Sequence, residues 1–562
     1  MSRFDHRKYR PFAPVGKTDR RWPDQVIRRA PLWCSVDLRD GNQALVQPMS
    51  VEQKTRLFHL LVRLGFKEIE VGFPAASKPD FDFVRAIIEQ GSVPDDVTIQ
   101  VLTQARPELI DRTFEALRGA RRAIVHVYNS TSRVQREQVF GLDRDGVKAI
   151  AVRGAEAVKA GAAMHPGTEW VFQYSPESFS GTELDFAVEV VDAVNEVWRP
   201  QDGQQVIVNL PATVEMATPN VFADQVEWFC DRVAHREHLT VSVHTHNDRG
   251  CAVAAAELAV MAGADRVEGT LFGNGERTGN TDIVTMAMNL YSQGVDPRLD
   301  LSDVAEIMDC YTECTRMPVH PRHPWVGELV YTAFSGSHQD AIRKGMSHHR
   351  ADGAWEVPYL PIDPRDLGRS YEEVVRINSQ SGKGGVAHVL ERDHGISLPR
   401  WLQQGLSRVV QADAEATGRE VSSARVRELF DAHYVTAPPD WTLHRYDLHR
   451  EGERVRADVW VGAGGADLRL RGHGNGVVEA LVDALGRQRG VAVEVERFDE
   501  HALSRGTDAS ALACVQVRVG DSQASASAFG EDTASAALQA VLTAVGRVIE
   551  SGSVPERAAA VG

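Results

Sequence analysis

The sequence predicts an α/β protein: a (β/α)₈ (TIM) barrel, followed by a helical linker region and a C-terminal α+β domain. Strand-like and helix-like runs alternate eight times between residues 30 and 295, which is the order and size of such a barrel. Polar residues gather at the carboxyl ends of nearly all these strands, where barrel enzymes hold their active sites. The alternation stops near residue 296, so a different architecture follows.

The strand-like runs are short, apolar and rich in β-branched residues, as is typical of buried parallel strands. They are Leu32–Val36, Glu68–Gly72, Thr98–Leu102, Ala123–Val127, Trp170–Tyr174, Val206–Asn209, Leu239–Val243 and Arg266–Leu271. The helix-like stretches between them are Val51–Leu64, Asp80–Glu89, Pro107–Leu117, Gly146–Lys159, Leu184–Val197, Phe222–Ala234, Ala252–Ala262 and Thr281–Tyr291. A doubly wound sheet is the alternative, but it usually has a glycine-rich phosphate loop after its first strand. The stretch "SVDLRDGNQ" at that position is not such a loop.

The second part of the chain has a different pattern. Helices and loops are expected from residue 296 to 430, and "TAPPD" at 436–440 has the composition of a linker. Strands are then expected over Trp441–His449, Arg454–Val461, Val491–Phe498 and Ala513–Val519, with helices over Val477–Arg487 and Ala534–Glu550. Two similar turns, "GHGNGVVEALVDAL" and "AFGEDTASAALQAVL", indicate a weak internal duplication. The predicted domains are an N-terminal extension (1–30), a catalytic barrel (31–305), a helical region (306–435) and a C-terminal domain (436–562).

The composition is that of an ordinary globular chain, with 43% hydrophobic and 25% charged residues among 562. The 62 basic and 78 acidic residues give a net charge of −16 without a long basic tract, which argues against nucleic acid as a partner. The six cysteines form no CxxC motif, so Cys310 and Cys314 are expected in a core. No run of eighteen apolar residues and no signal peptide is found, so a cytoplasmic protein without membrane contact is expected.

Two histidines stand two residues apart in "SVHTHNDRGCA", residues 242–252. Residues i and i+2 of a strand point to the same side, so His244 and His246 would project side by side from the end of the seventh strand. A divalent metal could bridge them there. The alternative is one buried, hydrogen-bonded histidine beside an exposed one, because histidine is also an ordinary half-buried residue.

The other strand ends favour the metal. The polar residues at these ends are Arg39, Asp40, Glu70, His126, Ser175, Glu177, Asn209, Thr213, Glu276 and Asn280. Asp40 and Asn280 add a carboxylate and an amide oxygen to the two imidazoles, a mixed set that suits Mg²⁺, Mn²⁺ or Zn²⁺ without selecting one. Open metal positions would let a 2-oxo acid chelate through its carboxylate and ketone oxygens. Arg39 could stabilise the oxygen as it becomes an alkoxide; alternatively, it forms a structural salt bridge with a barrel carboxylate.

Several motifs resemble those of the 2-isopropylmalate synthases, within the larger group that includes homocitrate synthases, citramalate synthases and hydroxymethylglutaryl-CoA lyase. They are "LRDGNQ", "EIEVGFPAAS", "YSPES", "NLPATVEMATPN", "HTHND", "GNGERTGN", "FSGSHQDAI" and "RINSQSGKGG", and they span nearly the whole chain. "HTHND" alone marks only the larger group. "YSPESFSGTELDF" and "NLPATVEMATPN", at this chain length, resemble the long form of the leucine-pathway enzyme.

The resemblance implies a Claisen-type condensation of acetyl-CoA with 3-methyl-2-oxobutanoate, after which thioester hydrolysis gives 2-isopropylmalate and CoA. It implies a divalent metal, Mg²⁺ in first place, with the ligands Asp40, His244, His246 and Asn280. It implies an oxo-acid pocket lined by Arg39, His126, Ser175, Glu177, Asn209 and Thr213. Deprotonation of acetyl-CoA and hydrolysis are associated with Glu177, His338 and Tyr371. The last two reach a neighbouring subunit's active site in this family, so a homodimer is implied.

The C-terminal domain resembles the family's regulatory domain, in which bound leucine inhibits catalysis. Gly474 and Gly476 of "GHGNGV" would let backbone N–H groups approach a small ligand, although Val477 stands where a proline commonly follows. Solvated loop histidines without a role are expected at His320, His323, His348 and His349. The functions that remain open are citramalate synthase, homocitrate synthase, a lyase that runs the carbon–carbon step backwards, and a non-catalytic amino-acid sensor.

Overall fold

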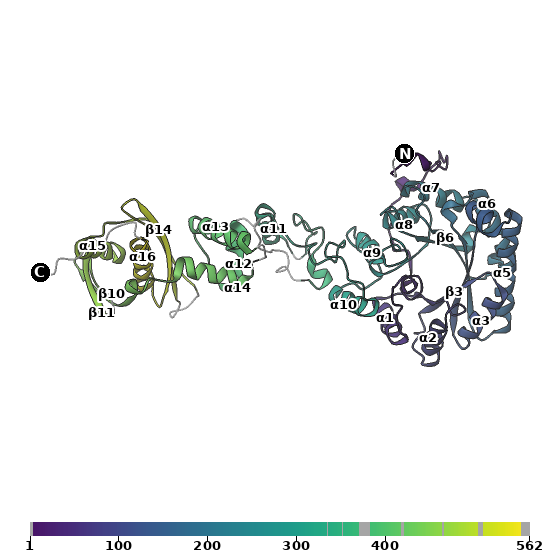
Figure 1. Cartoon of the computed structure of the whole chain (residues 1–562), viewed down its shortest axis with the longest axis horizontal. Coiled ribbons are helices and arrows are strands. Elements are labelled where there is room, and N and C mark those ends of the chain that lie inside the picture. Colours follow the sequence, from purple (N-terminus) through teal and green to yellow (C-terminus); the bar gives the residue numbers. More distant parts are fainter. Residues whose placement is uncertain are drawn as a thin grey trace. The chain divides into compact units, whose positions relative to one another are not determined.

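The computed structural model describes residues 4–333, 335–350, 352–369, 383–417, 421–463, 466–503 and 510–551. The chain divides into two compact units, and Figure 1 shows the chain with many of its helices and some of its strands labelled. The first unit holds Met1–Val330 and Ile362–Arg369, and the second holds Tyr331–Pro361 and Ser370–Gly562.

Eight parallel strands close into a barrel in the first unit, in chain order and with the last strand paired to the first. They are β1 (Leu32–Ser35), β2 (Glu68–Gly72), β3 (Thr98–Gln104), β4 (Arg122–Ser130), β5 (Glu169–Glu177), β6 (Val206–Ala212), β7 (Leu239–Thr245) and β8 (Arg266–Gly269). The surrounding helices are α1 (Val51–Leu64), α2 (Lys78–Glu89), α3 (Pro107–Leu117), α5 (Arg144–Met164), α6 (Leu184–Trp198), α7 (Pro219–Cys230), α8 (Ala252–Met261) and α9 (Ile283–Tyr291). The predicted barrel is confirmed, and each predicted strand overlaps an observed one.

Helix α1 shows how the sequence builds this outer layer. Ser50 and Gln53 form a capping box that satisfies the first backbone N–H groups of the helix. Leu57 and Leu61 face the barrel and are fully buried, and burying one such side chain contributes about 1.5–3 kcal/mol. The helix ends at Gly65, whose φ of 104° favours glycine.

The segment before the barrel is anchored on α7. Arg20 donates two hydrogen bonds of 2.7 Å to the carboxylate of Asp224, which also accepts one of 2.8 Å from Trp22 Nε1. Lys17 Nζ lies 2.8 Å from Asp231 Oδ2, and its side chain is only 3% exposed. Part of the expected N-terminal extension is therefore packed onto the barrel's helices.

The second unit combines a helical region with two sheets. Its helices α11 (Gly336–His348), α12 (Lys383–His394), α13 (Arg400–Thr417) and α14 (Ser423–Phe430) precede the C-terminal domain. That domain consists of β9 (Leu443–Glu451), β10 (Arg454–Ala463), β11 (Ala466–Gly474), α15 (Val477–Arg489), β12 (Val493–Ala502), β13 (Ala511–Val519), β14 (Ser522–Gly530) and α16 (Thr533–Glu550). The strands form two antiparallel sheets, in the orders β11-β10-β9 and β12-β13-β14.

The C-terminal domain repeats one motif of three strands and a helix, as the duplicated turns indicate. Gly474 and Gly530 end the third strand of each repeat, immediately before the helix. Apolar residues of both sheets, of α15 and of α16 share one core. Leu512 and Cys514 of β13 instead pack with Leu390 and Phe430 of the helical region. Deletion of residues 436–562 would therefore uncover the core of that helical region.

We expect alanine to act differently at the two glycines of "GHGNGV". A Cβ atom at Gly474 would lie 2.5 Å from the amide nitrogen of Ala480, whereas one at Gly476 meets nothing within 4 Å. Gly474→Ala should lower the unfolding free energy of the second unit by about 1–3 kcal/mol, and Gly476→Ala by less than about 0.5 kcal/mol. Urea unfolding followed by hydrogen exchange in α15 measures both values. Equal losses would contradict this account of the turn.

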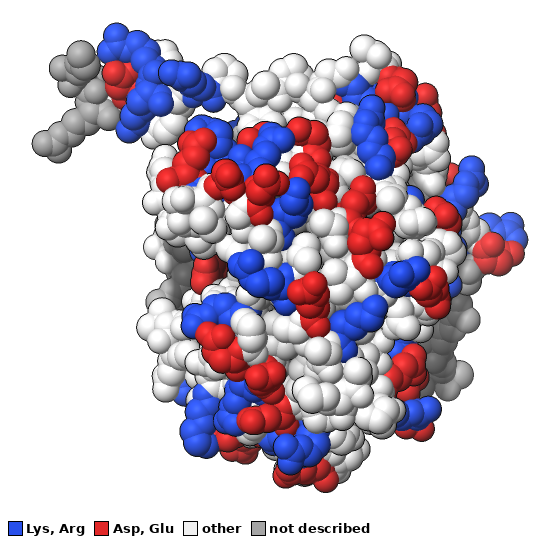
Figure 2. Space-filling model, turned by 90° about the vertical axis from the view of Figure 1, so that its right-hand side faces the viewer, with Lys and Arg blue, Asp and Glu red and all other residues white. Residues whose placement is uncertain are grey.

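Charges of both signs are interspersed on the face of the molecule shown in Figure 2. Ion pairs link neighbouring barrel helices, as between Arg144 of α5 and Asp185 of α6 at 2.8 Å. Among the described residues, no helix combines the length and the apolar character needed to cross a membrane. Cys310 and Cys314 are buried and unbonded, as the sequence predicts.

Candidate metal centre and active site

A cavity of about 230 Å³ opens at the carboxyl ends of the barrel strands. Most of the predicted site residues line it: Arg39, Asp40, His126, Ser175, Glu177, Asn209, Thr213, His244 and His246. Phe73, Leu102 and Pro211 add apolar surface to the same walls. The barrel thus brings charged, polar and apolar groups to one cavity, as a site for a small organic acid requires.

Three buried side chains in this cavity could hold a metal ion. The donor atoms of Asp40, His244 and His246 lie within 4.8 Å of one another. His244 Nε2 lies 3.2 Å, and His246 Nε2 3.5 Å, from Asp40 Oδ2. Asn280 Oδ1 lies 2.9 Å from His244 Nε2. A carboxylate, two imidazoles and an amide oxygen suit a divalent cation and do not discriminate among Mg²⁺, Mn²⁺ and Zn²⁺.

Short segments at the strand ends bring these donors together. Asp40 lies in a single π-helical turn, η3 (Asp37–Gly41), soon after β1, and such turns are frequent at functional sites. His246 directly follows β7 and forms an isolated bridge with Asn280. His244 and His246 are both buried and line the cavity. The alternative of one buried and one exposed histidine is therefore wrong.

Glu268 of β8 orients His244 from inside the barrel. Its Oε2 atom lies 2.8 Å from His244 Nδ1, which leaves Nε2 toward the cavity. Arg266 Nη1 donates to Glu268 Oε1 at 2.8 Å. Burial opposes the negative charge, but Arg266 and His244 hold the pKa of Glu268 well below its usual value. Glu268 is not among the predicted site residues, because within "RVEG" it resembles an ordinary charge on a strand.

Metal binding should depend on pH through His244. Burial disfavours the charged imidazole, but hydrogen bonds to Asp40 and Glu268 outweigh burial and raise the pKa of His244 to about 10. Since a metal needs the neutral nitrogen, binding must release this proton. We expect the metal affinity to rise about tenfold per pH unit between about pH 7 and 10. Calorimetry in buffers of different ionisation enthalpy measures the proton release.

The stability of the metal-free protein should change with pH in the direction opposite to that of the metal affinity. A raised pKa in the folded state means that His244 contributes stability fully below its unfolded value of 6.5 and loses it as pH rises through about 10. Metal affinity should thus increase over the range in which the metal-free fold weakens. An affinity that does not change over this pH range would contradict the protonated site.

Arg39 lies between two buried carboxylates beside the candidate metal donors. Its Nη1 donates to Asp40 Oδ1 at 2.7 Å, and its Nε donates to Glu70. The structural salt bridge offered as the alternative is thus present, and Arg39 also lines the cavity. Burial disfavours its charge, but Asp40 and Glu70 raise the pKa of Arg39 above its ordinary value. The guanidinium therefore stays positive next to the metal donors.

His126, Ser175 and Asn209 form one polar wall. The ring of His126 is held at both nitrogens, with Nδ1 2.9 Å from Glu70 Oε2 and Nε2 2.7 Å from Ser175 Oγ. Asn209 Nδ2 donates to the same hydroxyl at 3.0 Å. These bonds fix the orientations of the side chains before a ligand arrives, which preorganises the wall.

The residues associated with proton transfer are placed in different parts of the chain. Glu177 ends β5, accepts a hydrogen bond from Ser130 Oγ and lines the cavity. His338 belongs to α11 in the second unit, where its ring stacks on Tyr359 with centroids 4.1 Å apart. Tyr371 lies outside the described residues. The catalytic roles of all three stay predictions.

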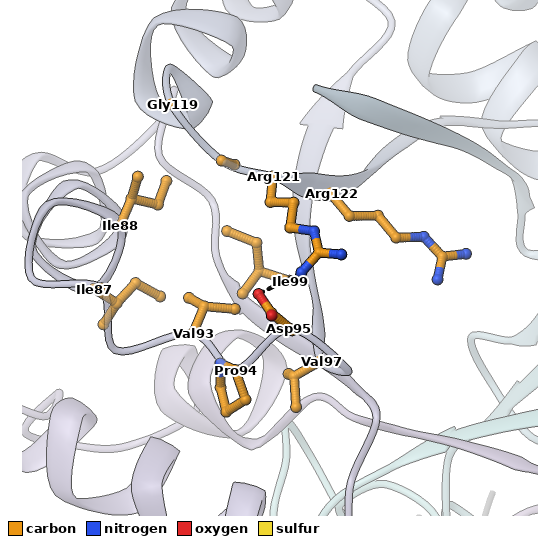
Figure 3. A pocket seen from close by; sticks show the side chains of 12 residues that line it. Ile87, Ile88, Val93, Pro94, Asp95, Val97, Ile99, Gly119, Arg121 and Arg122 are labelled. Atoms are coloured by element: carbon orange, nitrogen blue, oxygen red, sulfur yellow. Dashed lines mark ion pairs between the residues drawn. The ribbon is translucent and has the colours of Figure 1, made fainter. Parts of the chain in front are cut away.

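A second cavity, of about 170 Å³, lies at the amino-terminal ends of β3 and β4. Figure 3 shows Ile87 and Ile88 on one side of it and the ion pair between Arg121 and Asp95 on the other. Asp95 is the only carboxylate among the lining residues, which include no histidine or cysteine. This cavity has no donor set for a metal or for acid–base chemistry.

Comparison with known proteins identifies the family. Residues 30–310 match the family model described as HMGL-like. Residues 328–391 match the model described as alpha-isopropylmalate synthase, post-catalytic domain-like, and residues 420–549 match that of the LeuA allosteric (dimerisation) domain. A 2-isopropylmalate synthase from Alcanivorax borkumensis is 63% identical over 549 residues, 98% of each chain. This chain belongs to the 2-isopropylmalate synthase family.

Further 2-isopropylmalate synthases are similar over almost the same length. That of Rhodospirillum rubrum is 57% identical over 525 residues, 92% of this chain and 94% of that protein. That of Azotobacter vinelandii is 55% identical over 544 residues, 96% of this chain and 97% of that protein. The resemblance to the 2-isopropylmalate synthases found in the motifs is thus confirmed.

Proposed function

We propose that this chain catalyses the metal-dependent condensation of acetyl-CoA with 3-methyl-2-oxobutanoate and water to give 2-isopropylmalate and CoA. The observation that carries the proposal is the buried Asp40–His244–His246 cluster in the barrel cavity, in a chain that resembles 2-isopropylmalate synthases over its full length. A non-catalytic sensor would have no reason to retain this donor set beside Arg39.

The cavity offers a separate group for each part of the oxo acid. The groups that would hold the metal are Asp40, His244, His246 and Asn280. The bound metal would supply a Lewis acid for the ketone oxygen. Arg39 adds a fixed positive charge beside the same oxygen and would stabilise it as an alkoxide. The wall of His126, Ser175 and Asn209, with Thr213, would bind the carboxylate and orient the substrate.

The reaction needs a base, a proton donor and a water molecule. The base removes a proton from the methyl carbon of acetyl-CoA, and this carbon forms a bond to C2 of the oxo acid. The π electron pair of the ketone moves to its oxygen, which takes up a proton. Water then attacks the thioester carbonyl, the carbon–sulfur bond breaks, and CoA leaves as the thiol. Glu177, His338 and Tyr371 are the groups we propose for these proton transfers.

We infer that the C-terminal domain binds leucine and joins two copies of the chain. The match of residues 420–549 to a LeuA allosteric (dimerisation) domain supports both roles. The turn with Gly474 and Gly476 is the candidate contact, because Gly476 has open space beside it through which a small ligand could approach the backbone.

Thiol release from acetyl-CoA, with a divalent metal and a panel of 2-oxo acids, tests the proposal. We expect the highest kcat/KM with 3-methyl-2-oxobutanoate and inhibition by added leucine. Preference for pyruvate would indicate a citramalate synthase, and preference for 2-oxoglutarate a homocitrate synthase. If none of the acids leads to thiol release but the protein binds leucine, the result would indicate a non-catalytic sensor. One methylene group in a pocket changes specificity by only about 1–3 kcal/mol, so the full panel is required.

A further inference from the structure

The loop after β8, residues 270–282, carries Asn280 and is tied to itself. Asn280 donates from its backbone nitrogen to Gly273 O at 3.0 Å and from Nδ2 to Asn274 O at 2.9 Å. Thr270 and Asp282, at the two ends of the loop, form a β-bridge. The loop is therefore a rigid unit that positions the Asn280 oxygen. The position of this unit depends on the contacts that anchor its base, where Thr270 and Asp282 pair.

His323 anchors that base. Its Nε2 lies 3.0 Å from Asp282 Oδ2, and the two side chains are only 11% and 12% exposed. Its Nδ1 lies 3.0 Å from Pro324 O. The ring also meets Phe272 of the same loop edge-on, with centroids 5.5 Å apart. The expectation that His323 is a solvated loop histidine is therefore wrong, whereas His320 is exposed as expected.

The contact between His323 and Asp282 differs from the ion pairs on the surface, because Asp282 is buried. Its Oδ2 atom accepts one hydrogen bond from Thr285 Oγ1 and faces His323, and its Oδ1 atom has no hydrogen-bond partner among the described residues. His323 is the only basic side chain within ion-pair distance of this carboxylate in the described part of the chain. Loss of His323 would leave a buried carboxylate oxygen without its basic partner, which costs free energy unless the loop end moves.

His323 lies in the segment that connects the barrel to the second unit. It lies between α10 (Val304–Thr315) and Tyr331, where the second unit begins. The same segment is attached to helix α9 by Trp325, whose Nε1 donates to Asn289 Oδ1 at 2.8 Å. Residues that lead directly into the second unit thus contact the loop that carries Asn280.

We propose that His323 is a positioning residue for the metal centre: through Asp282 it holds the β8 loop so that the Asn280 oxygen stays in the ligand set. Metal affinity then depends on the segment that leads into the second unit. This inference rests on the metal site of the proposed function. It adds a residue that contacts neither the metal donors nor the cavity.

The test is Mn²⁺ binding to the full-length, metal-stripped protein, measured by calorimetry and by the electron paramagnetic resonance spectrum of the bound ion. We expect His323→Ala to weaken binding about tenfold, the lower range for outer partners of metal ligands. The exposed neighbour provides the matched control, and His320→Ala should bind like the unsubstituted protein. His323→Gln retains a donor toward Asp282 without the charge and should give an intermediate affinity.

A double-mutant cycle separates positioning from general damage to the fold. If His323 acts through Asp282, the combined His323→Ala and Asp282→Asn variant should bind Mn²⁺ no more weakly than the worse single variant. Unchanged affinity in His323→Ala, with a changed affinity in His244→Ala, would overturn this inference alone. Mn²⁺ binding that His244→Ala leaves intact would instead overturn the metal site itself. If His323→Ala does not fold, the affinity of His323→Gln decides.

Discussion

His244→Ala is expected to slow CoA release at least about 1000-fold at a fixed metal concentration. Lewis-acid stabilisation of a developing charge contributes several kcal/mol, and each 1.36 kcal/mol corresponds to a tenfold change in rate. The variant would lose the imidazole whose Nε2 lies near both Asp40 and Asn280. It would also leave Asn209 Nδ2, at 3.2 Å, as the remaining hydrogen-bond donor to Glu268 Oε2 on the cavity side. Metal affinity and turnover should therefore fall together.

The matched control is His238→Ala, because His238 immediately precedes the same strand and its side chain is 46% exposed. We expect that variant to keep the activity and metal content of the unsubstituted protein. Circular dichroism and metal analysis of both variants separate loss of the ion from loss of the fold. If His244→Ala kept its metal and stayed within tenfold of full activity, the proposed ligand set would be wrong.

The barrel could be predicted because its strands are continuous apolar runs separated by amphipathic helices. The carboxyl ends were harder to place: β5 continues to Glu177 and β4 to Ser130, beyond the last apolar residue of each run. The strands β11 and β14 were missed for another reason. "ADLRLRGHG" and "SQASASAFG" are poor in β-branched and aromatic residues, and they are strands because they pair with β10 and β13.

Some residues of the candidate site could also be predicted from the sequence, and others could not. His244, His246 and Asp40 could be proposed from position alone, since strand ends meet at one rim of a barrel. Glu268 and His323 could not, because their importance comes from partners distant in the chain. Glu268 can orient His244 only because β8 pairs with β7 and, as the barrel closes, with β1. His323 meets Asp282 across 41 residues of sequence, and no local pattern marks such a contact.

Arg266→Met is the substitution with the largest expected effect on stability. Arg266 is fully buried at the start of β8, and it donates to Glu268, to Ser242 Oγ at 2.9 Å and to Gln100 Oε1 at 2.8 Å. Methionine would take the arginine away from both Glu268 and Glu68, and the loss of one partner of a buried charge pair costs about 3–5 kcal/mol. Arg122→Met is the control at the first position of β4. Its side chain is 37% exposed beside Glu169, so its loss should cost less than about 1 kcal/mol.

Adding Glu268→Gln to Arg266→Met distinguishes stability from positioning of the metal ligand. The second change removes the buried negative charge that has lost Arg266, so urea unfolding should show recovery of about 1–2 kcal/mol. It also replaces the carboxylate that bonds His244 Nδ1, so metal affinity should stay about 10–100-fold below that of the unsubstituted protein. If affinity recovered together with stability, the charge on Glu268 would serve only the fold, and His244 would be oriented without it.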